Sequence, residues 1–136
     1  MPLTGVAPIK QAFVQFLRAD LTLRAAVTGI HEGQAPRGAK MPFLTYHIAW
    51  APYEYMWGST MLRVGIDVFV VAENGVDAGN IDALVLTRLH DAGLTVTGQT
   101  TLICRRVADV VVPPYVNEEG KRIHQVGGTY EVWTDQ

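Results

Sequence analysis

The sequence has few of the residues that mark several common protein classes. It contains a single cysteine, Cys104, among 136 residues, so it can form no internal disulfide and no cysteine-only zinc site. Its longest strictly apolar run, Val68 to Ala72, is far shorter than the ~18–20 residues that cross a bilayer. No lysine or arginine precedes Lys10, so the basic start of a signal peptide is missing as well. We therefore expect a soluble protein that is made in the cytoplasm and has no membrane partner.

An excess of charge of one sign is also missing. The chain has 11 lysine and arginine residues against 13 aspartate and glutamate residues, a net charge of −2 with histidine neutral. This balance argues against a protein that grips nucleic acid through a large basic face. Hydrophobic residues make up 49% of the chain and charged residues 18%, which is typical of a folded protein rather than a disordered one. The length fits one domain over residues 1–136.

Hydrophobic periodicity predicts two main helices. The first covers Pro8 to Arg18, and Asp20 then caps a shorter helical turn. The second runs from about Val76 to Ala92, with Asn74 as its N-cap and Gly93 as a left-handed end.

Strand signals occupy most of the remaining chain. β-Branched, aromatic and alternating residues predict strands at the start of 30–42 and over Phe43–Trp50, Met61–Val71, Leu94–Thr97, Leu102–Val112 and Lys121–Thr134. Gly127 and Gly128 inside the last strand indicate a bulge or a close backbone approach. The order of elements predicts an α+β fold, a largely antiparallel sheet with two main helices packed on one face. The helices should bury a shared cluster of Phe13, Phe16, Leu17, Leu84 and Leu89.

Catalytic and metal-binding patterns are missing from the sequence. The four histidines are scattered and show no ligand spacing, and we expect no metal and no cofactor; they are His31, His47, His90 and His124. Cys104 lies in a predicted strand, where a lone cysteine is usually a small buried hydrophobe. The acidic residues Asp77, Asp82 and Asp91 are most simply the solvated face of the second helix. No nucleophile elbow or phosphate-binding loop is present, so we predict that the protein is not an enzyme.

The connector over 52–60 stands out because it gathers aromatic residues where an isolated protein would place polar ones. It contains Tyr53, Tyr55, Met56 and Trp57, residue types that are enriched at the centres of protein interfaces. A second loop with Pro113 and Tyr115 has a similar but weaker character. These six residues are the candidate interface residues. The alternative is a loop that folds back on the core of its own chain.

The order of several short segments resembles that of the small tail-completion, or tail-terminator, proteins of long-tailed bacteriophages. The first helix and its "RADLTLRAAVTG" extension lead into "IHEGQAPRGAKMPFLTY", which is similar to the family's strand, loop and aromatic strand. "VGIDVFVVAENGVDAGNIDALVLTRLHDAGL" looks like its sheet strand and long helix, and "VVPPYVNEEGKRIHQVGGTYEVW" like its closing hairpin. The resemblance covers nearly the whole chain from about residue 8.

The resemblance implies a structural role in the virion. Such proteins form a ring, usually of six subunits, on the last ring of the tail tube, where they stop polymerisation and join the head connector. The implied partners are further copies of the chain, the tail tube protein and the head-completion or connector protein, at the head–tail junction of a particle assembled in the host cytoplasm. DNA would pass through the channel without specific binding, in keeping with the missing basic excess.

Two other interpretations remain open from the sequence. One is a neighbouring head–tail joining protein, or the terminator of a tail-derived particle, which belongs to the same structural class. The other is a small α+β enzyme or ligand-binding domain, which would need a pocket with converging polar groups.

Overall fold

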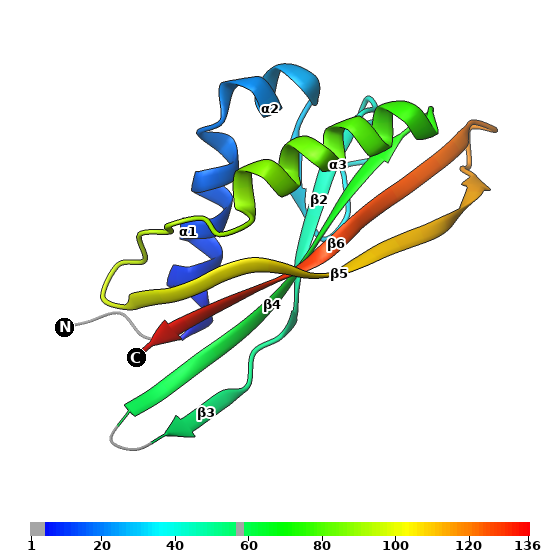
Figure 1. Cartoon of the computed structure of the whole chain (residues 1–136). Coiled ribbons are helices and arrows are strands. Elements are labelled where there is room, and N and C mark those ends of the chain that lie inside the picture. The colour runs from blue at the N-terminus through cyan, green and yellow to red at the C-terminus, as the bar shows by residue number, and fades with distance from the viewer. Residues whose placement is uncertain (1–4, 57–58) are drawn as a thin grey trace.

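The computed structural model describes residues 5–56 and 59–136 and contains three helices and six strands (Figure 1). In chain order they are α1 (Val6–Arg18), α2 (Leu21–Ala26), β1 (Ile30–Glu32), β2 (Phe43–Trp50), β3 (Tyr53–Met56), β4 (Ser59–Ala72), α3 (Gly75–Leu89), β5 (Thr100–Val116) and β6 (Arg122–Asp135). The predicted α+β class with a largely antiparallel sheet is confirmed.

The six strands form one sheet, in which five follow the order β1-β2-β4-β6-β5 and β3 lies off this path, paired with β4. Among the described residues, only β1 runs parallel to its neighbour, and all other pairs are antiparallel. The long strand β4 pairs with β6 along one side, and on its other side with β2 near its end and with β3 near its beginning. The β3–β4 hairpin and the β5–β6 hairpin therefore extend toward opposite ends of the molecule (Figure 1).

The core lies between the helices and one face of the sheet. Alternate residues of β4 point to this face and are buried: Leu62, Val64, Ile66, Val68, Val70 and Ala72. They share one hydrophobic cluster with buried side chains of all three helices. Of the predicted helix cluster, Phe13, Leu17 and Leu89 are fully buried, while Phe16 and Leu84 pack against its edge. We call the opposite face of the sheet the helix-free face.

Side-chain caps begin two of the helices as the sequence predicts. The Asp20 carboxylate accepts hydrogen bonds from the backbone N–H groups of Thr22 and Leu23 at 3.0 and 3.1 Å, at the start of α2. The Asn74 side chain accepts from the N–H of Val76 at 2.7 Å, at the start of α3. Each cap satisfies donors that have no partner within the helix.

The end of α3 differs from the prediction. The helix stops at Leu89, and Asp91 rather than Gly93 adopts the left-handed conformation, with φ of 57°. A short polar side chain tolerates this conformation because it can hydrogen-bond locally. The predicted strand over Leu94–Thr97 was wrong: these residues form no strand, although Leu94 and Val96 are buried. Their alternation reflects packing of a loop against the core rather than sheet pairing.

Within residues 5–56 and 59–136, no helix is long and apolar enough to cross a membrane.

Candidate assembly surface

The aromatic connector is a β-hairpin rather than the loop that the sequence predicts. Tyr53 pairs with Leu62, and Tyr55 with Thr60, so that β3 adds a short strand beside the start of β4. The backbone N–H of Arg63 donates to the Pro52 carbonyl at 3.0 Å, which fixes the entry into the hairpin. The sequence suggested a loop because it shows no apolar–polar alternation, yet tyrosine suits an exposed strand.

The hairpin presents its tyrosines to solvent. Tyr55 is 80% exposed and Tyr53 48% exposed, and their spacing of two residues places both on one face of β3. Between them Glu54 points to the other face and pairs with Arg63 at 3.5 Å. Of the other predicted interface residues, the Met56 side chain and Trp57 lie outside the described residues. We call the segment Tyr53–Tyr55 the aromatic knob.

The tyrosine pair lies on the helix side of the sheet but beyond the helices themselves. Tyr53 faces the same way as its partner Leu62, whose side chain belongs to the core. Trp50 lies nearby on the helix-free face, opposite Gly65. A Cβ atom on Gly65 would overlap the Trp50 indole, so a larger residue here would displace the indole. Trp50 is 39% exposed and was not among the interface residues predicted from the sequence.

The outer strand β5 is a second exposed surface. It is 17 residues long, and in the described part of the chain only β6 pairs with it. Five large apolar side chains along it are exposed: Leu102, Val107, Val111, Tyr115 and Val116. A long, apolar edge strand is prone to pair with another chain unless something covers it. This row of valines was missed because the sequence does not show which strand lies at the edge.

The Pro113–Val116 segment continues β5 and is not the loop that we predicted. Pro113 and Tyr115 are exposed, and the register of β5 against β6 shifts between Val112 and Tyr115. Proline lacks the N–H that a strand interior needs. This explains why the stretch lies in an edge strand and at a shift in the pairing register. The Tyr115 hydroxyl donates to the Gln125 amide oxygen at 3.1 Å.

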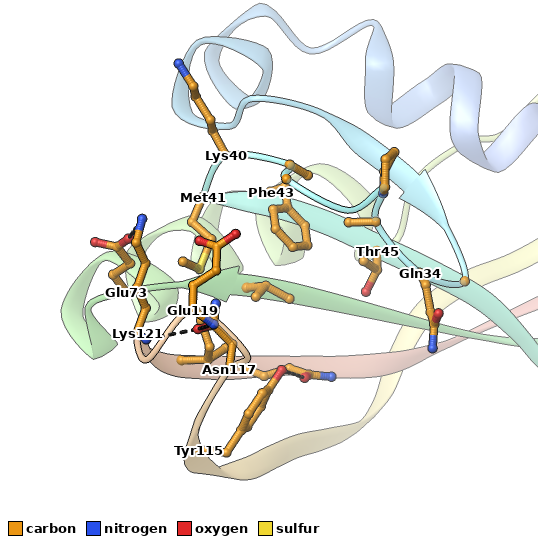
Figure 2. A pocket seen from close by; sticks show the side chains of 18 residues that line it. Gln34, Lys40, Met41, Phe43, Thr45, Glu73, Tyr115, Asn117, Glu119 and Lys121 are labelled. Atoms are coloured by element: carbon orange, nitrogen blue, oxygen red, sulfur yellow. Dashed lines mark hydrogen bonds and ion pairs between the residues drawn. The ribbon is translucent and has the colours of Figure 1, made fainter.

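A hollow of about 860 Å³ opens on the helix-free face, at the end of the sheet opposite the aromatic knob (Figure 2). Its floor is mixed and consists of the half-buried Phe43, the buried Val71 and Ile123, and the polar Thr45 and Gln125. One wall is the segment 33–41 and the other is the β5–β6 hairpin. Gly33 and Gly38 allow the first wall to turn, with φ of 71° and 83°. The two walls are far apart in sequence, so no local motif signals this hollow.

The rim of the hollow is polar and electrically balanced. Lys121 pairs with Glu73 at 3.2 Å, and Arg37 of the first wall reaches Glu118 of the hairpin turn at 3.8 Å. Arg37 and Glu118 are almost fully exposed, so this pair adds little stability. The hollow can thus accept an apolar group that carries a polar end.

An ion pair joins α3 to β5 on the side of the sheet that carries the helices. Arg106 donates to both carboxylate oxygens of Asp82, at 3.1 and 2.9 Å, and its Nε lies 2.8 Å from Asp109. Burial opposes the charge of Arg106, but the hydrogen bond to Asp82 and the neighbouring carboxylates outweigh it and raise its pKa. The expectation that Asp82 is a solvated helix residue was wrong, because its side chain is turned toward the sheet.

The residues that we screened for chemistry do not converge in the described structure. The histidines remain apart; His47, for example, pairs with Asp67 at 3.0 Å, and His90 lies 3.6 Å from Asp91. Residues 5–56 and 59–136 contain no group of three or more potential ligands that could hold a metal ion. Burial raises the pKa of the Cys104 thiol to about 12, which keeps it protonated and unreactive at neutral pH.

The sequence profile of the family described as "Tail completion protein gp17" matches residues 11–133. The chain belongs to this family. The resemblance that the sequence suggested is therefore confirmed, and the protein is a structural component of phage tails. No curated protein sequence matches the chain.

The fold of this tail completion protein is similar to that of a chain in a solved particle, "Virion of native gene transfer agent (GTA) particle". The two share 15% sequence identity with a TM-score of 0.72, over 97% of this chain and 100% of the other. At this level of identity the likeness concerns the fold alone.

Membership in a tail completion family gives the exposed surfaces a physical meaning. A protein that becomes part of a particle must keep apolar area uncovered until it meets its neighbours. The aromatic knob, the β5 edge and the hollow are the places where the described structure offers such area or space for it.

Proposed function

We propose that this tail completion protein is a tail terminator. It forms a ring on the last ring of the tail tube, stops tube polymerisation and presents the surface that joins the head connector. The family match over residues 11–133 carries the proposal, since it covers nearly the whole chain.

The exposed apolar surfaces support a ring built from identical copies. They lie at different places on the subunit, with the aromatic knob at one end of β4 and the β5 edge on the far side of the sheet. Two different patches favour head-to-tail contacts over a two-fold dimer, and head-to-tail contacts close into a ring when the rotation fits. We infer six subunits from the family resemblance.

The charge of the chain supports a channel through which DNA slides. Each phosphate that a protein neutralises adds salt-dependent affinity, and a genome must leave the tail quickly. A net charge of −2 per subunit supplies no excess of positive charge to hold it. DNA is thus a passing partner, while the tail tube protein and the head-completion protein are the binding partners at the head–tail junction. The family supports a structural role without catalysis.

Substitution of the candidate interface residues tests the proposed function. Replacing Tyr53 and Tyr55 with serine removes exposed aromatic rings and leaves the core unchanged, so the subunit should fold with an unaltered melting temperature. Particles assembled with this variant should have overlong tails, or tails that never join heads. Leu21→Ser is the matched control, because Leu21 is 76% exposed on α2, away from the hairpin.

Normal tail length together with full head joining in the double variant would argue that the tyrosines serve no interface. If tail length is also normal when the protein is deleted altogether, the terminator role itself is wrong. If the chain were instead a neighbouring head–tail joining protein, its deletion would give tails of normal length that lack heads, which separates the two assignments. The remaining candidates, Met56, Trp57, Pro113 and Tyr115, can be tested in the same assay.

A further inference from the structure

We propose that the aromatic knob of one subunit docks in the hollow of the next copy of the same chain. This contact would be the repeated joint of the ring, and it rests on the proposed terminator function. The two surfaces are both present in one chain and lie far apart within it. The knob of a subunit therefore cannot reach the hollow of the same subunit.

Strand register places the knob and the hollow at opposite ends of β4. Tyr53 and Tyr55 pair with Leu62 and Thr60 near its beginning, whereas Val71 of the hollow floor lies near its end. Leu62 and Val71 are nine residues apart along β4, so at the usual rise per strand residue the two surfaces are separated by roughly 30 Å. Each copy therefore donates a knob at one end and offers a hollow at the other, which is a head-to-tail arrangement.

The two surfaces also lie on opposite faces of the sheet. The tyrosines project to the side of the sheet that carries the helices, as does their neighbour Leu62. The hollow lies on the helix-free face, since Val71 alternates with the core residues Val70 and Ala72. Adjacent copies can thus overlap at their ends, with the helix side of one hairpin against the helix-free face of the next subunit.

The chemistry of the hollow suits a tyrosine side chain. The half-buried Phe43 offers an apolar contact for the ring above the buried Val71 and Ile123, and polar side chains at the edge, such as Gln34, can bond the hydroxyl (Figure 2). Tyrosine combines a large apolar body with a polar tip and needs both kinds of neighbour when buried. Glu54 of the knob is paired with Arg63, and the four charged side chains that line the hollow, Lys40, Glu73, Glu119 and Lys121, sum to zero, so neither surface repels the other through a net charge.

The size of the contact predicts when the ring forms. Two tyrosines bury roughly 300–500 Å² between them, whereas a stable interface needs about 800 Å² from each partner. The knob alone is therefore too small to hold two free subunits together. The ring should assemble on the tail tube, where a second contact made by every subunit strengthens the first.

Disulfide cross-linking in purified particles tests the joint. The only native cysteine, Cys104, is buried, so it does not compete with cysteines introduced elsewhere. Tyr55→Cys together with Gln34→Cys places one thiol on the knob and one at the hollow. Tyr55→Cys with Leu21→Cys is the control, because Leu21 is as exposed as Tyr55 but lies on α2. Tyr53→Cys with Lys40→Cys is the second pair if the first does not fold.

We expect oxidation to give a ladder of oligomers up to the closed ring in non-reducing gels. The yield should be about tenfold above the control, because a disulfide forms only where the Cα atoms approach within ~7 Å. The knob-and-hollow joint is wrong if the protein is present at the tail end but neither cysteine pair gives a ladder. The proposed terminator function would not be affected by that result. Cross-links from the hollow to the tube or connector protein overturn it as well, and identify another occupant. A protein that is absent from the tail end contradicts the proposed function and the joint together.

Discussion

Arg106 on the edge strand β5 holds Asp82 of α3 through two parallel hydrogen bonds of 3.1 and 2.9 Å. The same guanidinium contacts the Gly127 carbonyl on β6 and lies over the Tyr130 ring, 5.7 Å from its centroid. One side chain thus joins the helix layer to both strands of the long hairpin. A guanidinium suits this position because its planar fork matches a carboxylate in a way that an ammonium does not.

Replacing Arg106 with lysine should destabilise the fold although it preserves the charge. Lysine cannot form both bonds to Asp82, and the Arg106 side chain is only 7% exposed. We expect a loss of about 3 kcal/mol in the free energy of unfolding, the scale for breaking a buried pair. Urea denaturation measures it, and Arg105→Lys on the exposed side of the same strand is the matched control. Equal effects of the two substitutions would mean that the Asp82 pair contributes nothing specific.

The helix cluster should respond unequally to the loss of its two phenylalanines. Phe13 is fully buried, and its ring centroid lies 6.2 Å from that of Tyr130 with the rings tilted, so Phe13→Ala should cost ~3–5 kcal/mol. Phe16 lies at the edge of the core beneath the Arg88 guanidinium, at 3.7 Å, and its loss should cost about 2 kcal/mol. Thermal or urea unfolding of both variants compares them. A larger cost at Phe16 would reverse the assignment of core and edge.

Two glycines should give opposite results when replaced with alanine. A Cβ atom on Gly127 would meet the Val68 carbonyl of the neighbouring strand, so Gly127→Ala should destabilise by about 3 kcal/mol, the upper end of overpacking costs. Gly79 lies inside α3 with nothing within 4 Å of an added Cβ, and Gly79→Ala should stabilise by about 0.5–1 kcal/mol. If the melting temperature falls in both variants, the space around Gly79 in α3 is not open as the structure indicates.

The thiol of Cys104 should be protected until the protein unfolds. Burial raises its pKa to about 12, compared with about 8.5 for an unfolded thiol. Because the folded state keeps the proton longer, this group stabilises the fold fully below pH ~8.5, and its contribution is lost as pH rises toward 12. Alkylation at pH 8 should be slow in native protein and fast in urea. Rapid alkylation of the native protein would show that β5 opens easily.

The sequence predicted those features that depend on a few neighbouring residues. The caps at Asp20 and Asn74 and the strand Phe43–Trp50 are confirmed because the signal for each is local. The predicted close backbone approach at Gly127 is confirmed as well, although the nearest register shift lies in β5 and not in β6.

Features that depend on distant residues were not predictable in the same way. Asp82 looked solvated because its partner is 24 residues away, on a strand whose orientation the sequence does not give. The hollow combines the segment 33–41 with residues of the β5–β6 hairpin, and the valines of β5 gain meaning only once β5 is known to end the sheet. Of the candidate interface residues, the sequence pointed to Tyr53 and Tyr55, which the structure leaves exposed, but not to the strand that carries them.

The symmetry and position of the protein in purified particles test the central claim most directly. Averaged cryo-electron microscopy images of the tail end should show one ring of this chain, six-fold symmetric, between the last ring of the tube and the head connector. A single copy, a two-fold dimer or a location elsewhere in the particle would contradict the terminator ring.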